Sequence, residues 1–373
     1  MCSGVSALLG GLFGLGNQVS TNSSACATGT EAVVGCYRHV RAGLAERMIA
    51  GSSECDSPYV GAGFDAMRVT ARKGNDSPER ASRPLSGSAS GFVPGAGAGA
   101  LMLESLESAT RRRARIYAEI SGAEINCGGQ RGGGSITASN PEGVQRCIRA
   151  AVGASGRKTE IGYINGHLTA TGGDPKEVAN LLAGLRVPPE RLPLLNSTKS
   201  MIGHTLGAAG AIECVATVLQ LKYGFIHPSL NCEDVHPLIA PVARSIPHET
   251  VEVPWIRAAL KTSFGFGDVN ACVLFSKWDE SWRTGRTMEN EQQEIRAKFM
   301  TVIRPFVRNL TVEEITDETL LIEDLRVNSA RLVDIILEME DQFQIRIEDD
   351  EAESLTSVGR AIGLICSKKR VAA

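Results

Sequence analysis

Long apolar runs are missing from this sequence of 373 residues, and no stretch approaches the roughly 20 uncharged apolar residues of a membrane span. The apolar opening, residues 1–20, has no basic segment in front of it, which argues against a secretory signal. Basic and aromatic residues do not cluster, and aromatics are only 5% of the chain, which argues against nucleic-acid binding. We therefore expect a cytoplasmic protein that binds neither membranes nor nucleic acid.

Cysteine pairs at metal-binding spacing are also missing, because the ten cysteines are scattered and form no Cys-x-x-Cys motif. This pattern argues against a zinc site and against a disulfide framework. We expect no resident metal, and we expect most of the cysteines to be small buried side chains in a reducing compartment. The residues that are present, 43% apolar and 22% charged, are ordinary for a globular chain of two or three domains.

The net charge of −3 is distributed unevenly along the chain. Residues 290–373 contain 17 acidic and 11 basic side chains, so this part carries −6 and the rest of the chain carries +3. An acidic segment beside a basic body is compatible with electrostatic docking between the two or with similar partners. The alternative is that both surfaces are simply solvated, and charge alone does not decide between them.

Apolar periodicity over residues 30–276 alternates between helical and extended patterns, which predicts an α/β core. The expected helices cover residues 30–50, 140–156, 174–186 and 203–221. The expected strands cover residues 100–103, 116–120, 161–164, 192–195 and two runs within 258–276. The last of the helices is rich in Ala and Gly, so we expect it to pack closely against its neighbours.

The pattern changes at residues 278–290, a polar stretch that we interpret as a linker. Beyond it, two stripes of apolar residues recur at helical spacing with no strand pattern between them, which predicts a small all-α bundle. The stripes comprise Ile295, Phe299, Val302, Ile303 and Phe306, then Leu332, Ile335, Ile336, Met339 and Phe343.

Three short segments contain residues suited to thioester chemistry. Asn-Ser-Ser-Ala-Cys-Ala-Thr-Gly surrounds Cys26, Asn-Gly-His-Leu-Thr-Ala-Thr surrounds His167, and Ser-Thr-Lys-Ser-Met-Ile-Gly-His ends at His204. Cys26 precedes an expected helix, whose N-terminal N–H groups favour a thiolate and can lower the thiol pKa below its ordinary value of about 8.5. Taken singly, each segment is explained by a structural cysteine or histidine. The three together favour a catalytic set.

With the Phe-Gly-Phe-Gly turn at 264–267, these segments resemble those of the elongating β-ketoacyl-ACP synthases, over residues 8–277. The resemblance implies an α/β thiolase-like layered fold for residues 1–277. It also implies acyltransferase activity, in which the cysteine accepts an acyl group from a carrier thioester. Malonyl-carrier then loses CO₂ and its enolate attacks the acyl group, a decarboxylative Claisen condensation of fatty-acid or polyketide biosynthesis.

The same resemblance assigns roles residue by residue. Cys26 is the nucleophile, and His167 and His204 are neutral donors that stabilise the enolate oxygen and assist decarboxylation. Lys199 organises the site through hydrogen bonds, with Glu213 as its partner.

The resemblance also implies that Phe266 gates the acyl pocket and that its backbone N–H completes an oxyanion hole with that of the nucleophile. Nearby residues depart from the family pattern, because Asp268 replaces a glycine of this turn and Leu168 and Ala170 replace a Gly and a Ser.

The larger departure is at the start, where only 25 residues precede the nucleophile and the family's first strands and helices are missing. We expect another polypeptide or an upstream segment to complete this half, in a homodimer or a heteromer.

Residues 291–371 resemble an acyl carrier protein, most clearly in the segment Leu-Leu-Ile-Glu-Asp-Leu-Arg-Val-Asn-Ser-Ala-Arg-Leu at 320–332. The resemblance implies a small all-α four-helix bundle in which Ser329 carries 4′-phosphopantetheine, attached by a phosphopantetheinyl transferase. Asn328 and Ala330 replace the usual Asp and Leu beside this serine. A serine at a helix start is also a common N-cap, which is the alternative role for Ser329.

Three functions are open from the sequence. The first is a condensing enzyme fused to its own carrier, whose partners are acyl and malonyl carrier proteins. The second is a non-catalytic partner or chain-length subunit, or a carrier-only protein, in a synthase complex. The third is a thiolase-like acyltransferase that uses Cys26 without decarboxylation. The Cys-His-His set favours the first, and the short N-terminal region favours the second.

Overall fold

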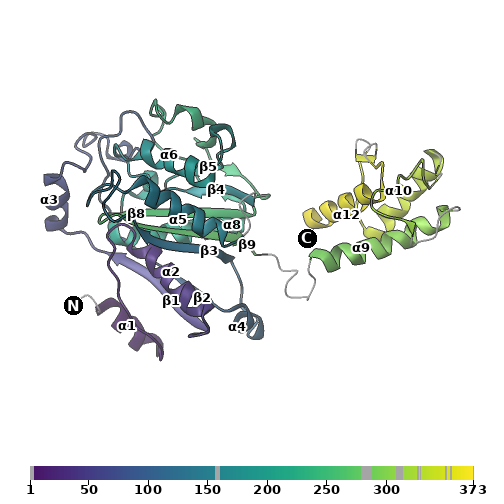
Figure 1. Cartoon of the computed structure of the whole chain (residues 1–373), viewed down its shortest axis with the longest axis horizontal. Coiled ribbons are helices and arrows are strands. Elements are labelled where there is room, and N and C mark those ends of the chain that lie inside the picture. The colour runs from purple at the N-terminus through teal and green to yellow at the C-terminus, as the bar shows by residue number, and fades with distance from the viewer. Residues whose placement is uncertain are drawn as a thin grey trace. The chain divides into compact units, whose positions relative to one another are not determined.

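The computed structural model describes residues 4–155, 160–278, 288–307, 314–325, 327, 329–348, 351–352 and 355–372. The chain divides into two compact units, Met1–Trp278 and Asp279–Ala373 (Figure 1). The first unit is α/β and the described part of the second is helical.

A mixed five-stranded sheet forms the centre of the first unit, in the order β3-β9-β8-β4-β5. Strands β8 and β9 are buried over almost their whole length, which explains their continuous apolar character. β4 pairs in parallel with β5 and β8, whereas β9 is antiparallel to β8 and β3. The strands are β3 (Ala118–Cys127), β9 (Val269–Lys277), β8 (Ala258–Gly265), β4 (Ile161–Asn165) and β5 (Leu194–Asn196).

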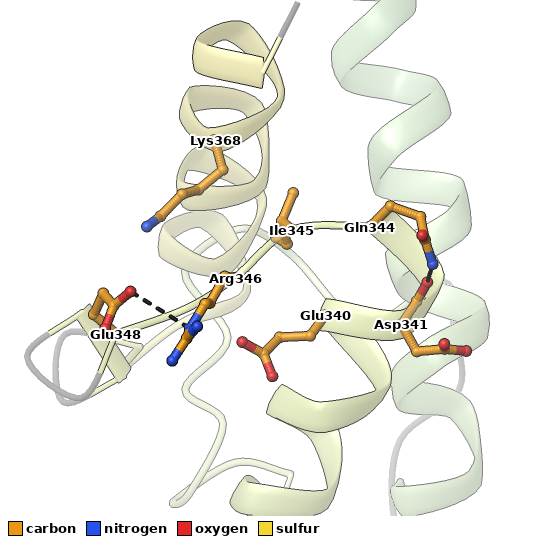
Figure 2. A pocket seen from close by; sticks show the side chains of 7 residues that line it. All are labelled: Glu340, Asp341, Gln344, Ile345, Arg346, Glu348 and Lys368. Atoms are coloured by element: carbon orange, nitrogen blue, oxygen red, sulfur yellow. Dashed lines mark hydrogen bonds and ion pairs between the residues drawn. The ribbon is translucent and has the colours of Figure 1, made fainter.

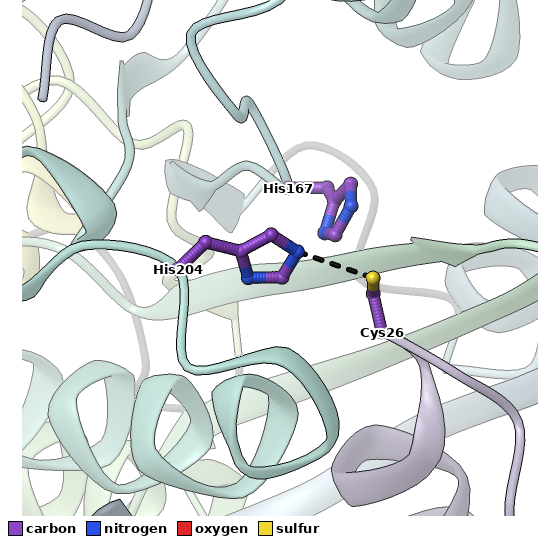
Figure 3. A group of neighbouring side chains, drawn as sticks. All are labelled: Cys26, His167 and His204. Atoms are coloured by element: carbon purple, nitrogen blue, oxygen red, sulfur yellow. Dashed lines mark hydrogen bonds between the residues drawn. The ribbon is translucent and has the colours of Figure 1, made fainter. Parts of the chain in front are cut away.

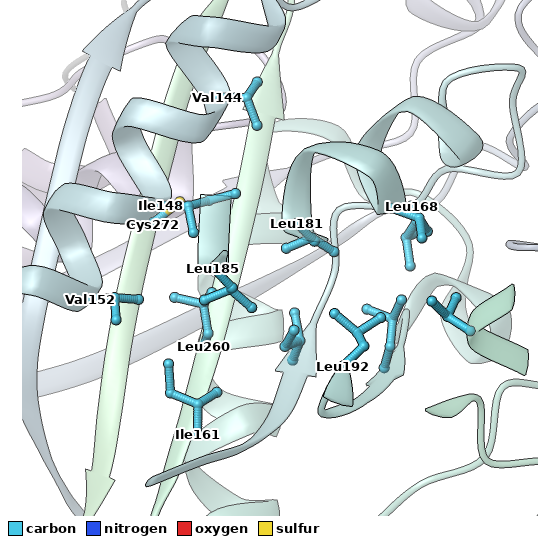
Figure 4. Packing of buried hydrophobic residues seen from close by; sticks show 14 of the residues in the cluster. Val144, Ile148, Val152, Ile161, Leu168, Leu181, Leu185, Leu192, Leu260 and Cys272 are labelled. Carbon is cyan, nitrogen blue, oxygen red and sulfur yellow. The ribbon is translucent and has the colours of Figure 1, made fainter. Parts of the chain in front are cut away.

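Two pairs of helices cover the two faces of this sheet (Figure 1). Leu260 and Leu274 belong to the core beneath α5 (Pro141–Gly153) and α6 (Asp174–Leu185), shown in Figure 4. The neighbouring residues in these strands, Ala259 in β8 and Phe275 in β9, belong to a second core. Because successive side chains of a strand point to opposite faces, these two cores lie on opposite sides of the sheet.

The second core is built around α2 (Thr28–Arg41) and α8 (Ala209–Tyr223). Both helices also contact an antiparallel pair of strands, β1 (Arg47–Glu54) and β2 (Gly97–Glu104), on their other side. The order of layers is therefore helix pair, five-stranded sheet, helix pair and two-stranded sheet. This layered α/β arrangement confirms the fold class expected for residues 1–277.

Most expected elements of this unit are present, but the helix expected over residues 30–50 is wrong at its C-terminal end. α2 ends at Arg41, Gly43 has φ +73°, and residues 47–54 form β1. The cause is tertiary, because residues 47–54 pair with β2 along their whole length. The short helices α1 (Gly4–Phe13), α3 (Pro58–Ala66) and α4 (Leu106–Arg111) were not expected from the sequence, and α1 buries none of its residues.

Short elements complete the first unit. Among them α7 matters for the site, because it begins at Lys199. They are α7 (Lys199–Ile202), β6 (Phe225–Ile226), β7 (Val251–Glu252) and 3₁₀ turns at Pro78–Arg80, Pro189–Arg191, Leu206–Ala208 and Ala240–Ser245.

The described residues of the second unit form three α-helices: α9 (Met288–Ile303), α10 (Ser329–Phe343) and α12 (Val358–Ala372), with a 3₁₀ turn at Arg304–Phe306. Both predicted apolar stripes enter its core, which includes Phe299, Ile335 and Met339. α9 begins inside the stretch interpreted as a linker, since Met288, Glu289 and Glu291 are good helix formers. The rest of that linker, residues 279–287, lies outside the described residues.

A pocket lies at the C-terminal end of α10, between this helix, the segment that follows it and α12 (Figure 2). Two of its charged groups form an ion pair, Arg346 with Glu348 at 3.7 Å, and the backbone N–H of Ile347 donates to Glu340 at 2.7 Å. The pocket is at the opposite end of α10 from Ser329. Its lining comprises Glu340, Asp341, Gln344, Ile345, Arg346, Glu348 and Lys368.

Two expectations from composition can be compared with the structure. Among the residues described, no helix combines the length and apolar character that crossing a bilayer would require. The nine cysteines in the described part of the chain are all free, and five of them are buried. The buried ones are Cys26, Cys147, Cys214, Cys232 and Cys272.

Candidate active site

Cys26 lies in a tight turn immediately before α2. Ala25 has φ +47°, a left-handed conformation that is costly for a residue with a side chain. The turn is held by Thr28, whose backbone N–H and hydroxyl both donate to the Ala25 carbonyl, at 3.1 and 2.7 Å. Gly265 at the end of β8 allows the close approach, since a Cβ there would be 2.5 Å from the Ser24 carbonyl oxygen.

His204 reaches the thiol from the loop after α7. Gly203, at φ +72°, turns the chain, and a Cβ on it would be 2.7 Å from the Val93 carbonyl oxygen. That same carbonyl accepts the backbone N–H of His204 at 2.7 Å, which fixes the loop. The His204 Nε2 consequently lies 3.1 Å from the Cys26 Sγ (Figure 3).

His167 lies beside His204, with ring centroids 5.4 Å apart, on the loop that follows β4. The loop is held by a buried carboxylate of α6: Glu177 accepts the backbone N–H groups of His167 and Leu168 at 2.6 and 2.8 Å. The side-chain donor atoms of Cys26, His167 and His204 all lie within 4.8 Å of one another. The structure therefore brings together three side chains that the sequence separates widely (Figure 3).

A buried cluster of charges lies behind this set. Lys199, the first residue of α7, contacts Glu213 of α8 through its Nζ at 2.5 Å. The other carboxylate oxygen of Glu213 lies 2.8 Å from Nζ of Lys261, on β8. The sequence predicted the first pair and missed Lys261, although a single lysine within an apolar central strand was a visible signal.

Burial raises the pKa of the Cys26 thiol to about 11. The charge of Lys199 and the backbone N–H groups of Cys26 and Phe266 act in the opposite direction, but burial outweighs them. The expectation of a lowered thiol pKa is therefore wrong for this conformation. The helix N-terminus is present as expected, but the thiol is almost completely enclosed, and enclosure penalises the thiolate.

The two imidazoles are held neutral. Burial, followed by the charge of Lys199, puts the pKa of His204 well below its ordinary value, and Lys261 acts in the same direction. The pKa of His167 is also well below its ordinary value, for the same two leading reasons, with His204 and Lys261 adding to them. A neutral imidazole nitrogen therefore faces a thiol whose pKa is raised.

Phe266 is half-buried and follows β8 directly, at the turn towards β9. Its backbone N–H and that of Cys26 both act on the same sulfur, which is the arrangement expected for an oxyanion hole. Its ring is 6.0 Å from that of Phe64, whose own neighbour Phe92 lies 5.0 Å from the His204 ring. Phe64 and Phe92 were not predicted from the sequence to be part of this wall.

Asp268, in the same turn, has a structural explanation. Its carboxylate is buried and accepts the backbone N–H groups of Gln130 and Asn140, at 2.8 and 2.7 Å. Its φ of +64° is the conformation for which glycine is the usual residue. The side chain thus ties the glycine-rich loop 128–140 to the turn that holds Phe266.

A metal is a chemical alternative for this donor set. In the part of the chain that the structure describes, one group of three possible metal-ligand side chains has suitable spacing, and it consists of Cys26, His167 and His204. Two lysine ammonium groups lie behind these side chains, and the thiol is protonated, so the surroundings disfavour a divalent cation. The geometry fits an anionic transition state better than a resident metal.

Two family models match the chain: the β-ketoacyl synthase N-terminal domain over residues 1–109 and the β-ketoacyl synthase C-terminal domain over residues 117–233. Among curated proteins, the chain is 40% identical to the chloroplastic 3-oxoacyl-acyl-carrier-protein synthase II of Arabidopsis thaliana, covering 69% of this chain and 47% of that protein. It is 37% identical to 3-oxoacyl-acyl-carrier-protein synthase 1 of Escherichia coli, covering 74% and 66%. The chain thus spans between about half and two thirds of these relatives.

Solved structures agree with these matches. A β-ketoacyl synthase from Burkholderia phymatum has a TM-score of 0.68 at 30% identity, covering 74% of this chain and 66% of that one. The AntDE:AntF complex, a type II polyketide acyl-carrier protein with its ketosynthase, gives the same score and identity, covering 74% and 67%. The first unit therefore has the thiolase-like ketosynthase fold. The chain belongs to the β-ketoacyl synthase family.

Proposed function

We propose that this chain catalyses the decarboxylative condensation of an acyl thioester with a malonyl thioester. The observation that carries the proposal is the contact of 3.1 Å between the Cys26 Sγ and the His204 Nε2, with His167 beside them. A non-catalytic chain-length subunit has no use for an enclosed thiol, two neutral imidazoles and a buried Lys–Glu pair. Relatives named 3-oxoacyl-acyl-carrier-protein synthases support the same reaction class.

The first half of the reaction is acyl transfer. The Cys26 Sγ forms a bond to the acyl carbonyl carbon, its proton moves to the His204 Nε2, and the bond to the carrier sulfur breaks. The carrier thiolate leaves with that proton, which returns His204 to its neutral form. The backbone N–H groups of Cys26 and Phe266 stabilise the oxyanion of the tetrahedral intermediate.

The second half is decarboxylation and condensation. The N–H groups of neutral His167 and of neutral His204, the latter after a shift to its Nε2–H tautomer, stabilise the enolate oxygen that appears as malonyl thioester loses CO₂. The enolate carbon then bonds to the acyl carbonyl carbon, and the bond to the Cys26 sulfur breaks. The Cys26 thiolate that is released takes up one proton from solvent, and the β-ketoacyl thioester leaves. Two cationic imidazoles would repel each other at this spacing, which is a reason for keeping both neutral.

The test is a two-stage assay on the full chain. We expect an acyl thioester to add its acyl mass to the peptide that contains Cys26, and subsequent malonyl-carrier to yield CO₂ and a β-ketoacyl product. Peptide mass spectrometry measures the first stage, and trapping of labelled CO₂ measures the second. Acylation without CO₂ release would instead support a simple acyltransferase, and the absence of both would reject the proposal.

We further propose that the second unit is an acyl carrier domain whose attachment site is Ser329. α10 begins at this residue, which is where an attached arm would be exposed, although its side chain lies outside the described residues. The outward face of α10 combines exposed acidic groups with the exposed apolar residues Val333 and Leu337, as a docking helix does. The acidic groups on that face are Asp334, Glu338 and Asp341.

4′-Phosphopantetheine fits this position chemically, because it would add a long flexible thiol to the Ser329 hydroxyl. Co-expression with a phosphopantetheinyl transferase is expected to raise the intact mass by one phosphopantetheine group, and Ser329→Ala is expected to abolish the gain. Ser357→Ala, a serine of the same unit located before α12, is the matched control and should retain it. A modified S329A protein would overturn the assignment.

A further inference from the structure

Glu213 forms ion pairs with two lysines, Lys199 and Lys261. Lys261 has no role in the chemistry described above. Lys261 is completely buried in the central strand β8, and its Nζ lies 2.8 Å from the carboxylate oxygen that Lys199 does not occupy. Enclosing a third charge in the core is costly, so neutralising a single glutamate does not account for it. Lys199 alone already does that.

The ammonium group of Lys261 also connects to the other histidine loop. Its Nζ donates to the carbonyl oxygen of Thr262, the next residue in the strand. The hydroxyl of Thr262 donates to Glu177 at 3.3 Å, and this is the carboxylate that accepts the backbone N–H of His167. Lys261 thus lies at the junction of two hydrogen-bonded paths. One reaches Lys199 and α7, which precedes His204, and the other reaches the loop of His167.

The charge of Lys261 acts on both imidazoles as well. It lowers the pKa of His204 and of His167, after burial and Lys199. Removing one positive charge makes protonation of an imidazole easier, so the pKa of each ring rises. Besides each other, the two rings have the Cys26 thiol of the turn before α2 and the charges of Lys199 in α7 and Lys261 in β8 around them. Glu177 of α6 contacts the backbone of His167, and Glu213 of α8 contacts the two lysines.

We propose that Lys261 is a positioning residue of the condensing site, which fixes Glu213 from β8 and, through Thr262, the loop that holds His167. Its charge keeps the two imidazoles in the uncharged form that can donate to an enolate oxygen. This inference rests on the proposed function for its consequence in catalysis. Its effect on the two imidazoles is measurable without any turnover.

The test compares three substitutions in the full chain. Lys261→Gln removes the charge but keeps a donor for the Glu213 carboxylate and the Thr262 carbonyl. Lys261→Arg keeps the charge. Lys277→Gln is the matched control, at the end of the neighbouring strand β9, where the Lys277 Nζ donates to the Pro254 carbonyl at 2.9 Å. Imidazole C–H resonances of His167 and His204, followed by NMR against pH, report the ionisation of each ring.

We expect both imidazoles in K261Q to titrate at higher pH than in the wild type, and we expect K261R and K277Q to resemble the wild type. CO₂ release from malonyl-carrier should show a shift in the same direction: its acid limb should move to higher pH, so that K261Q loses more activity in that limb than at pH 8.5.

Unchanged imidazole titration in a folded K261Q protein would overturn the inference, as would a loss of rate that is uniform with pH. If K261Q does not fold while K261R does, the role of Lys261 is structural and the inference is rejected. A wild-type protein that releases no CO₂ would reject the proposed function instead, and the NMR comparison would still decide the role of Lys261.

Discussion

Cys26→Ala is expected to abolish condensation while leaving decarboxylation of malonyl thioester measurable. Without the sulfur no acyl-enzyme forms, and loss of a catalytic nucleophile typically lowers the rate by at least about 10⁴-fold. His167 and His204 are unchanged in this variant, and their backbone N–H groups remain fixed by Glu177 and Val93. CO₂ release should therefore persist within about tenfold of the wild type, because the donors to the enolate oxygen remain.

Parallel assays of β-ketoacyl product and of labelled CO₂ distinguish these two effects. Cys232→Ala is the matched control, because Cys232 is equally enclosed but lies in the core beneath α5 and α6. Condensation by C26A at more than a few per cent of the wild-type rate would show that another group is the nucleophile. A loss of CO₂ release as large as the loss of condensation would show that the thiol is needed to place the imidazoles.

The pattern of the sequence was sufficient for the elements with strong periodicity. α5 begins at Pro141 after Asn140, whose side chain accepts the backbone N–H groups of Glu142 and Gly143, and this start is legible from the sequence. β1 was missed because Arg-Met-Ile-Ala-Gly-Ser-Ser-Glu has no alternating pattern. Its pairing with β2 depends on close contact at Gly51, where a Cβ would be 2.7 Å from the Gly99 carbonyl oxygen.

The candidate site was predictable as a set of residues but not as an electrostatic environment. The motifs identified Cys26, His167 and His204, and the structure places their donor atoms within 4.8 Å. The thiol pKa was expected below its ordinary value, whereas burial raises it. The position of a helix can be predicted from the sequence, but the burial of a side chain in the folded chain cannot. Lys261 was missed although a single lysine within an apolar strand was a visible signal, because its partner Glu213 lies on a different element.

Gly210→Ala is expected to destabilise the first unit severely, because Gly210 is where α8 crosses α2. A Cβ on Gly210 would be 2.3 Å from the backbone nitrogen of Thr30, and a Cβ on Gly29 would be 2.3 Å from that of Ala211. Neither contact involves a flexible side chain that could move aside. Alanine in a helix adds about 1 kcal/mol to the free energy of unfolding relative to glycine, but separating two packed helices costs more. We expect the free energy of unfolding to fall by about 3 kcal/mol in total.

The expectation that this Ala- and Gly-rich helix packs closely is thus confirmed, and the crossing links stability to the site. α2 begins two residues after Cys26, and Glu213 lies one helical turn beyond Gly210, so separating the helices moves the thiol away from the Lys–Glu cluster. Urea unfolding, followed through the fluorescence of the buried Trp278, measures the loss of stability in this unit.

Gly35→Ala is the matched control for the crossing, because Gly35 lies on the exposed side of α2, where a Cβ would meet nothing within 4 Å. The same substitution should stabilise the unit there by up to about 1 kcal/mol, since only helix propensity changes. If the free energy of unfolding rises in G35A and falls in G210A, the helix crossing, not the loss of glycine, sets the stability. If G210A unfolds at the wild-type urea concentration or above, the two helices can separate without cost.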